Sequence, residues 1–326
     1  MPTLSRRQLL RDAALLGVFG PLLAACGRSA APAERKAGAE PGEHETAASG
    51  EAQAAGEAHA AAAGPHWAYE GSEGPDVWGS LDPSFATCSG GRSQSPIDLP
   101  LHAGAAGITQ IVFDYKPTKL NLANNGHTIQ AEYDPGSTMS LDGKRYELLQ
   151  FHFHVPSEHR LGGIEYPMEA HLVHRASDGA LAVVGVFFYG GLRDKPGIAA
   201  STAKTPVLDK LWQSLPSKGV TIRKADTVDV SGLLPFDRSY VTYEGSLTTP
   251  PCTEGVRWLL LTTPVLAGQS HVEKFLAIVG RNARPPQPLN GRMVGGGYAQ
   301  AREGTPSAQA DAFGPPTPAP VAPERH

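Results

Sequence analysis

The pentapeptide Gln150-Phe151-His152-Phe153-His154 and the tripeptide Glu169-Ala170-His171 are the most informative part of this 326-residue chain. Together they supply three imidazoles for a divalent metal and no fourth protein ligand. Structural zinc sites are usually closed by four protein ligands, whereas catalytic sites leave one position for water. The two segments therefore predict a catalytic zinc site, although imidazole ligands also suit cobalt and iron.

The alternation of histidine and phenylalanine indicates how the ligands are held. Successive side chains of a strand point to opposite faces, so the two histidines share one face and the two aromatic rings the other. Glu169 and His171 are likewise two residues apart in a second predicted strand. A metal-bound imidazole needs its second nitrogen fixed, and Gln150 and Glu169 are placed to do this. An isolated His-x-His could equally line a polar strand face without binding a metal. The third histidine, which has its own acidic partner, argues against that alternative.

The middle of the chain reads as one β-rich domain. Short β-branched or aromatic runs bounded by Gly, Pro, Asn or Asp predict strands, and two stretches have a helical pattern. The predicted strands are 108–113, 120–122, 128–133, 147–155, 168–175, 181–189 and 256–262, and the predicted helices are 207–214 and 271–279. Periodicity alone does not give the order of these strands in a sheet.

Several separate motifs between His66 and Val294 resemble those of the bacterial alpha-class carbonic anhydrases and follow one another in that family's order. They are His66-Trp67-x-Tyr69, Gln94-Ser95-Pro96-Ile97, Asn124-Asn125-Gly126-His127, Gln150-x-His152-x-His154, Ser157-Glu158-His159, Glu169-x-His171-Leu172-Val173-His174, Gly245-Ser246-Leu247-Thr248-Thr249-Pro250-Pro251, and Asn282-Ala283-Arg284-Pro285 with Asn290-Gly291-Arg292. Any one of them could be chance, but their joint order argues for the family.

The resemblance implies both a fold and a reaction. The fold would be a single β-rich α+β domain with a large, twisted, mostly antiparallel central sheet and short peripheral helices. The reaction would be the reversible hydration of CO2 to bicarbonate and a proton, by attack of a zinc-bound hydroxide. His152, His154 and His171 would hold Zn²⁺. Three neutral imidazoles leave the ion its full positive charge, which favours hydroxide over water near neutral pH.

The resemblance also assigns roles around the metal. Thr248 would accept the proton of the hydroxide and donate its own to Glu158, so that a lone pair faces the substrate. His127 would carry protons to solvent, because a group that titrates near neutrality transfers them in both directions. His159 and His174 would be hydrogen-bonded wall residues. The CO2 pocket would be lined by Val173, Val183, Leu247, Thr249 and Trp258, and the proton path by Tyr69, Asn125 and Gln130, the last standing where the family commonly has Asn.

The first 25 residues have the pattern of an export signal. Arg6 and Arg7 precede an apolar run that is too short to span a bilayer comfortably. The run ends Leu23-Ala24-Ala25-Cys26, which resembles a bacterial lipobox and predicts cleavage before Cys26 and lipidation of its thiol. We therefore expect export to the periplasm or cell envelope, with a lipid anchor. Twin-arginine export and ordinary secretion both stay open.

Two further segments lack the large apolar residues that a core requires. Residues 26–64 are rich in Ala, Gly and Glu and are predicted to form a disordered linker after the lipidated cysteine. Residues 297–326 are predicted to form a disordered Pro- and Ala-rich tail. The expected organisation is therefore a signal peptide over 1–25, the linker, a carbonic anhydrase domain over 65–296, and the tail.

The three cysteines are expected to have two different fates, lipidation for one and a disulfide for the other two. If Cys26 takes lipid, Cys88 and Cys252 remain as an even pair in an exported chain, where disulfides persist. Bacterial members of the family resemble this chain in having a cysteine at each matching position, so we predict a bond that anchors the loop carrying Thr248. Two buried free thiols are the alternative.

Charge and composition limit the classes of binding partner that we expect. A formal net charge of -4, spread over both signs, gives no basic footprint for nucleic acid. CO2 and bicarbonate are the expected small-molecule partners, contact with a membrane is expected only through Cys26, and a homodimer is left open. A catalytically silent binding module of the same fold and a zinc esterase are the alternative functions. The presence of all three zinc histidines argues against the first, and the lack of a recognisable acyl pocket against the second.

Overall fold

The computed structural model describes residues 65–101, 103–105, 111–190, 205–298 and 300–301. The predicted signal peptide, Cys26, the linker and all but the first few residues of the tail lie outside these ranges, as does the start of the strand predicted at 108–113. Within the described ranges, no helix has the length and apolarity needed to cross a membrane.

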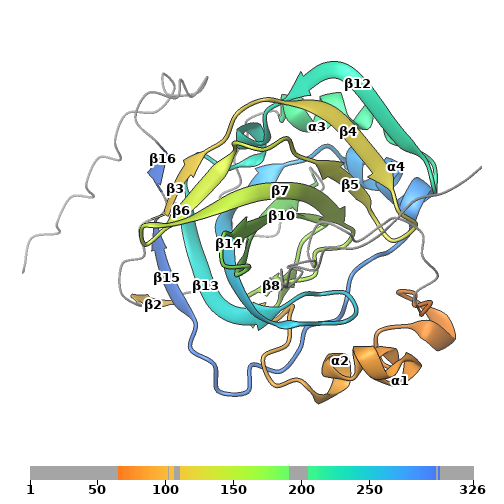
Figure 1. The fold of residues 1–326 in the computed structure, drawn as a ribbon, viewed down its shortest axis with the longest axis vertical. Coiled ribbons are helices and arrows are strands. Elements are labelled where there is room, and N and C mark those ends of the chain that lie inside the picture. Colours follow the sequence, from red (N-terminus) through yellow and green to blue (C-terminus); the bar gives the residue numbers. More distant parts are fainter. Residues whose placement is uncertain (1–64, 102, 106–110, 191–204, 299, 302–326) are drawn as a thin grey trace, which may run out of the picture. The chain divides into compact units, whose positions relative to one another are not determined.

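A 13-stranded sheet forms the body of the described domain (Figure 1). Its main path runs through β12 (Thr221–Val228), β4 (Thr118–Asn124), β5 (Ile129–Glu132), β7 (Lys144–His154), β10 (Met168–Ala176), β11 (Leu181–Tyr189), β14 (Glu254–Leu266), β13 (Ser239–Ser246), β15 (Gly295–Tyr298) and β2 (Gly104–Ala105). β6 (Thr138–Leu141) also pairs with β7, β3 (Ile111–Asp114) with β6, and β16 (Gln300–Ala301) with β3. Most pairs are antiparallel, and β11 with β14 is a parallel exception. The predicted fold class is confirmed.

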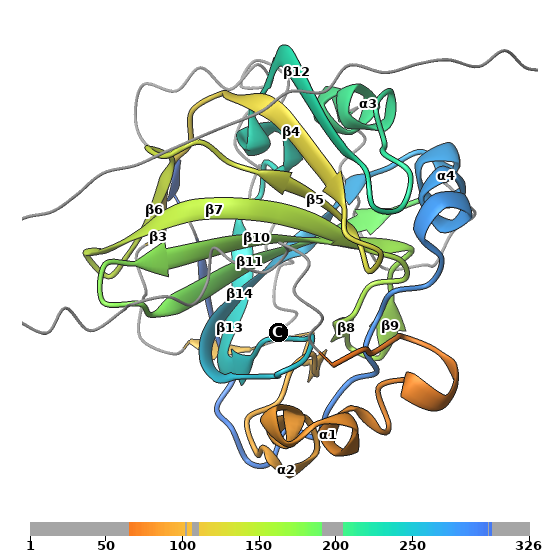
Figure 2. The same ribbon diagram turned by 45° about the vertical axis from the view of Figure 1, so that its right-hand side comes forward.

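Short helices lie at the margins of this sheet. α1 (Trp78–Leu81) and α2 (Thr87–Gly90) lie at one margin in both views, and α3 (Pro206–Trp212) and α4 (Gln269–Val279) lie on the other side, near β12 (Figure 2). The remaining elements are the 3₁₀ turns η1 (Gly71–Glu73), η2 (Pro83–Phe85) and η3 (Val230–Leu233), and a small sheet of β1 (Asp98–Leu99), β8 (Arg160–Leu161) and β9 (Ile164–Glu165).

The core lies on both faces of the central strands. β11 is buried along almost its whole length, which explains its continuous apolar sequence Leu-Ala-Val-Val-Gly-Val-Phe-Phe-Tyr. On one face, Phe151 and Phe153 of β7 pack with Phe188, Trp212 and Phe275. The other face of β7 is thereby left for its polar side chains.

Nine of the sixteen described strands were absent from the sequence-based prediction, and β12 and β13 are the longest of the nine. β12 is exposed along most of its length, so it shows no apolar alternation to detect. β13 is buried at nearly every position and mixes Ser, Thr and Tyr, so it lacks the alternation that a one-sided strand would show. β7 and β14 also extend beyond their predicted ends, to Lys144 and Leu266.

The predicted disulfide between Cys88 and Cys252 is present. It joins the short helix α2 to the loop between β13 and β14, and both cysteines are buried beside Trp78 and Phe85. The main-chain N–H of Cys252 donates to the carbonyl of Thr249 at 2.8 Å. The bond therefore fixes the loop that carries Thr248, as predicted.

Candidate metal centre and active site

β7 and β10 bring three imidazoles to one place. His152 lies opposite His171 across the two strands, and His154 follows two residues further along β7. One ligating nitrogen of each ring lies within 4.8 Å of the others. His154 and His171 are buried and His152 is half-buried. Among the described residues, no further His, Cys, Asp or Glu side chain belongs to this group.

Two of these rings are held by the residues predicted to hold them. The Nδ1 atom of His152 lies 2.9 Å from Oε1 of Gln150, and Nε2 of His171 lies 2.8 Å from Oε1 of Glu169. Because amide and carboxylate oxygens only accept, each of these nitrogens carries the hydrogen. The lone pairs are therefore on Nε2 of His152 and on Nδ1 of His171.

His154 is held by Asn282, a residue for which no role was predicted. Its Nδ1 donates to the main-chain oxygen of Asn282 at 2.7 Å, which leaves the lone pair on Nε2. That Nε2 atom is buried and has no hydrogen-bond partner among the described residues. Burial lowers the pKa of His154, and the charge of Glu158 opposes this shift without reversing it. A neutral, buried and unpartnered lone pair is costly unless it binds a cation, so the donor set fits a divalent metal.

The carboxylate of Glu169 accepts four hydrogen bonds and so connects the ligand His171 to its neighbours. Oε1 accepts from Nδ1 of His159 as well as from His171, both at 2.8 Å, and Oε2 accepts the main-chain N–H groups of Glu158 and His159 at 2.9 Å. Burial alone would raise the pKa of Glu169, but His159 and His171 outweigh it and hold that pKa well below its usual range. The second nitrogen of His159 accepts from the hydroxyl of Tyr243 at 2.7 Å, so His159 is a wall residue, as expected.

Glu158 keeps one carboxylate oxygen available. Its Oε1 accepts the main-chain N–H of Arg284 at 2.9 Å, whereas Oε2 is buried without a hydrogen-bond partner in the described ranges. Thr248 is buried in the loop between β13 and β14, and that loop is closed by a 2.9 Å bond from the N–H of Leu247 to the carbonyl of Thr253. Arg284 belongs to one of the family motifs, but no role was predicted for it.

An apolar wall crosses three neighbouring strands. Val173 of β10 lies opposite Val183 of β11, which in turn lies opposite Trp258 of β14. These residues and Leu247 belong to one hydrophobic cluster, in which Val183 and Trp258 are buried. Thr249, which lies two residues after Leu247 in the same loop, is half-buried. The register of the sheet thus gathers three of the predicted pocket residues, and Leu247 packs against them from the loop after β13.

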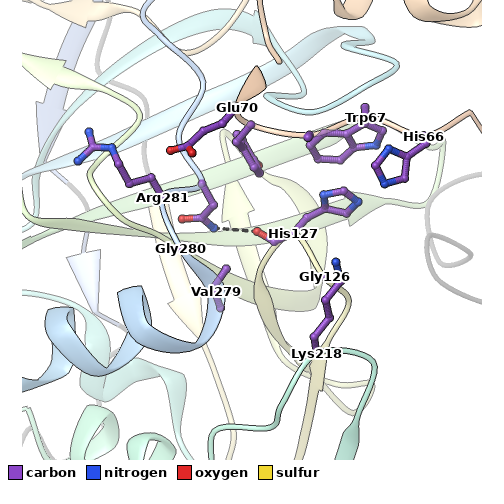
Figure 3. A pocket seen from close by; sticks show the side chains of 12 residues that line it. His66, Trp67, Glu70, Gly126, His127, Lys218, Val279, Gly280 and Arg281 are labelled. Atoms are coloured by element: carbon purple, nitrogen blue, oxygen red, sulfur yellow. Dashed lines mark hydrogen bonds between the residues drawn. The ribbon is translucent and has the colours of Figure 1, made fainter. Parts of the chain in front are cut away.

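The predicted shuttle residue lies at a rim built from loops (Figure 3). The His127 ring stacks on Trp67, with ring centroids 3.8 Å apart and an interplanar angle of 9°. Tyr69 meets the His127 ring edge-on at 6.5 Å. The main chain of His127 is fixed on both sides: its N–H donates to Oδ1 of Asn125 at 2.9 Å, and its carbonyl accepts from Nδ2 of Asn282 at 3.0 Å.

The remaining predicted residues of the proton path have partners of their own. Gln130 of β5 lies opposite His152 of β7, and its side-chain N–H donates to the carboxylate of Glu132. Burial raises the pKa of Tyr69 well above its usual value, and the charge of Glu158 acts in the same direction, so the phenol keeps its hydrogen. The hydroxyl of Tyr69 is therefore both a donor and an acceptor, whereas a side-chain N–H of Gln130 is already bonded to Glu132.

Comparisons with known proteins agree with this geometry. Residues 73–296 match the family model of the eukaryotic-type carbonic anhydrases. A carbonic anhydrase of Nostoc sp. is 43% identical over 237 residues, which are 70% of this chain and 85% of that protein. The alpha-carbonic anhydrase structure of Photobacterium profundum is 44% identical with a TM-score of 0.63, over 70% of this chain and 99% of that one.

A relative that was solved with a bound ligand has the same fold. The structure of dioscorin complexed with ascorbate is 31% identical with a TM-score of 0.62, over 72% of this chain and 99% of that one. The family model covers most of the described domain, and it includes all three clustered histidines. The chain belongs to the alpha, or eukaryotic-type, carbonic anhydrase family.

Proposed function

We propose that the protein catalyses the reversible hydration of CO2 to bicarbonate and a proton, with Zn²⁺ as its metal. The observation that carries this proposal is the set of three converging lone pairs on His152, His154 and His171, each ring fixed by a bond from its other nitrogen. When bound, zinc supplies a Lewis acid that makes water acidic enough to act as a nucleophile near neutral pH.

Thr248 and Glu158 would orient the attacking oxygen. The buried Oε2 of Glu158 has no donor among the described residues, so it is suited to accept the hydroxyl hydrogen of Thr248. The Thr248 oxygen would then be available only as an acceptor, which fixes the direction of the nucleophile's own hydrogen. The apolar wall of Val173, Val183 and Trp258 would hold CO2 without competing for hydrogen bonds.

His127 would move the proton that the reaction releases. Imidazole is the side chain that both accepts and donates a proton near neutral pH. The ring stands at the rim rather than among the buried ligands, with Asn125 fixing its main chain and Tyr69 beside it. Gln130 and Tyr69 would order the water molecules through which the proton travels.

Export is part of the proposal. The disulfide between Cys88 and Cys252 is of the kind that persists in oxidising compartments, which supports a location outside the cytoplasm. We further propose that residues 1–25 form the signal, that Cys26 is lipidated, and that the linker and the tail flank a catalytic domain over 65–296.

A CO2 hydration assay beside an ester hydrolysis assay, each with and without a chelator, tests the function. We expect zinc-dependent CO2 hydration to dominate and ester hydrolysis to be a slow side reaction of the same site. A stable, zinc-free protein without hydration activity would instead support a binding module like dioscorin. Efficient turnover of esters alone would support the esterase alternative.

A further inference from the structure

The two side chains that would orient the nucleophile come from separate parts of the sheet. Glu158 lies just after β7, whereas Thr248 lies in the loop between β13 and β14. In the described sheet, β7 and β13 are separated by β10, β11 and β14, so no strand pairing fixes one side chain against the other. Their relative position must therefore be set by contacts outside the strand ladder.

Arg284 makes such contacts through both its main chain and its side chain. Its main-chain N–H donates to Oε1 of Glu158 at 2.9 Å. Its guanidinium donates to the main-chain oxygens of Ser95 and Cys88 at 2.7 and 2.8 Å, and to Oε1 of Gln94 at 2.9 Å. These are charge-assisted bonds from a rigid fork, which the single nitrogen of a lysine does not reproduce.

Stability alone does not account for a charged side chain at this position. Arg284 is 2% exposed, and its Nε atom has no hydrogen-bond partner among the described residues. Burial lowers the pKa of Arg284 to about 10, and the charge of Glu158 acts in the opposite direction. Because a buried charge costs free energy that apolar packing would avoid, the gain from this arginine lies in the geometry that it imposes.

Gln94 extends the connection to the loop of Thr248. Since Oε1 of Gln94 accepts from Arg284, its side-chain nitrogen is free to donate to the main-chain oxygen of Cys252, at 3.1 Å. The N–H of Cys252 in turn donates to the carbonyl of Thr249 at 2.8 Å. A continuous set of hydrogen bonds thus joins the support of Glu158 to the residue that follows Thr248.

We propose that Arg284, acting with Gln94, is a positioning residue that sets the distance between Glu158 and Thr248. The proposal rests on the function proposed above and adds the part of the chain that holds its orienting pair together. The buried Oε2 of Glu158 can accept the hydroxyl hydrogen of Thr248 only if the two loops stay within reach of each other. A displacement of about 1 Å in such a pair can lower a rate by about 100-fold.

The test is a double-mutant cycle on the full, zinc-loaded chain with Arg284→Lys and Thr248→Ala. The lysine keeps the positive charge but cannot make all three guanidinium contacts. In the wild-type background we expect Arg284→Lys to lower the rate of CO2 hydration about tenfold, with zinc content unchanged. In the Thr248→Ala background it should cause little further loss, because the group that it positions is already absent.

Arg292→Lys is the matched control. Arg292 also donates to three main-chain oxygens, those of Leu289, Glu244 and Pro288, and none of these belongs to the connection described above. This variant should keep nearly the wild-type rate. An equal loss from Arg284→Lys in both backgrounds, or no loss in the wild-type background, would overturn the proposal.

Gln94→Met interrupts the same connection without changing a buried charge, and it takes the place of Arg284→Lys if that variant does not fold. Crystal structures of the wild type and the variant give a readout that does not depend on activity. We expect the separation between Oγ1 of Thr248 and the carboxylate of Glu158 to increase in the variant, and an unchanged separation would overturn the proposal. If neither protein hydrates CO2 but the separation still increases, the proposed function fails and the positioning role stands.

Discussion

The site has two regions that are built differently, a floor and a rim. The floor consists of the three histidines of β7 and β10 with Gln150 and Glu169, and its hydrogen bonds come largely from the same two strands. The rim consists of loops distant in sequence, where His127 meets Trp67 and Asn282. The comparison shows a metal-binding geometry built on paired strands, whereas the proposed transfer of the proton would use groups in loops near the surface.

Removal of a floor ligand should have the largest effect. His154→Ala deletes the most deeply buried lone pair, so we expect loss of stoichiometric zinc and a fall of CO2 hydration to near the uncatalysed rate. Metal analysis and stopped-flow hydration measure both. His174→Gln, which changes another buried histidine of β10, is the control and should retain zinc. A zinc-loaded, active His154→Ala protein would break the distinction between floor and rim.

The variant Thr248→Ala should have the next largest effect on activity. It removes one preorganised hydrogen-bonding group while leaving the ligands in place, so turnover should fall by about two orders of magnitude with zinc content unchanged. Thr248→Ser keeps the hydroxyl and should recover most of the rate. A nearly wild-type rate in the alanine variant would exclude Thr248 from the mechanism.

Glu169→Gln tests whether the floor depends on its support as well as its ligands. The change replaces a carboxylate that accepts four hydrogen bonds, so zinc affinity should fall by about 10- to 100-fold. Competition with a chromophoric chelator measures the affinity. Glu165→Gln, at the surface, serves as the control, and equal affinities in the two variants would contradict the role of Glu169.

A change at the rim should slow turnover less. His127→Ala should lower turnover about tenfold in dilute buffer, less than a general acid or base usually contributes, because dissolved buffer partly replaces it. Zinc content should not change, and added imidazole should restore the rate. If neither slowing nor rescue occurs, His127 is an ordinary surface histidine.

The smallest effect on activity is expected from His174, which lies beside the floor but does not belong to it. Nε2 of His174 bonds to the hydroxyl of Tyr115 at 2.8 Å, and burial lowers the pKa of His174 to about 4. Between pH 6.5 and 4 the unfolded chain binds a proton that the folded chain does not, so stability falls as the pH falls. The lowering of the His174 pKa corresponds to about 3 kcal/mol in all.

Denaturant unfolding of the metal-free protein across this pH range measures that contribution. His174→Gln keeps a hydrogen-bonding side chain but cannot titrate, so its stability should depend less steeply on pH than that of the wild type. An unchanged slope would show that His174 does not titrate as its burial indicates.

The floor could be predicted from sequence because its information is local. Alternation along β7 placed the histidines and phenylalanines on opposite faces, and the partners Gln150 and Glu169 each lie two residues from the ring they hold. The fold class and the disulfide followed from motif order and from cysteine positions. Local rules suffice where one strand supplies both a ligand and its support.

The rest could not be predicted because its contacts span the chain. Asn282 holds His154 from 128 residues away, and Arg284 reaches Glu158 across 126. Nothing near Trp67 indicates that it stacks on His127. β12 is exposed and has no apolar pattern, so neither the strand nor its pairing with β4 could be predicted from the sequence.

The most direct test of the metal site is a crystal structure of the zinc-loaded protein with diffraction data collected at the zinc absorption edge. We expect one strong anomalous peak from a zinc ion held by Nε2 of His152, Nε2 of His154 and Nδ1 of His171, with solvent in the fourth position. Absence of that peak, or a fourth protein side chain bound to the metal, would contradict it.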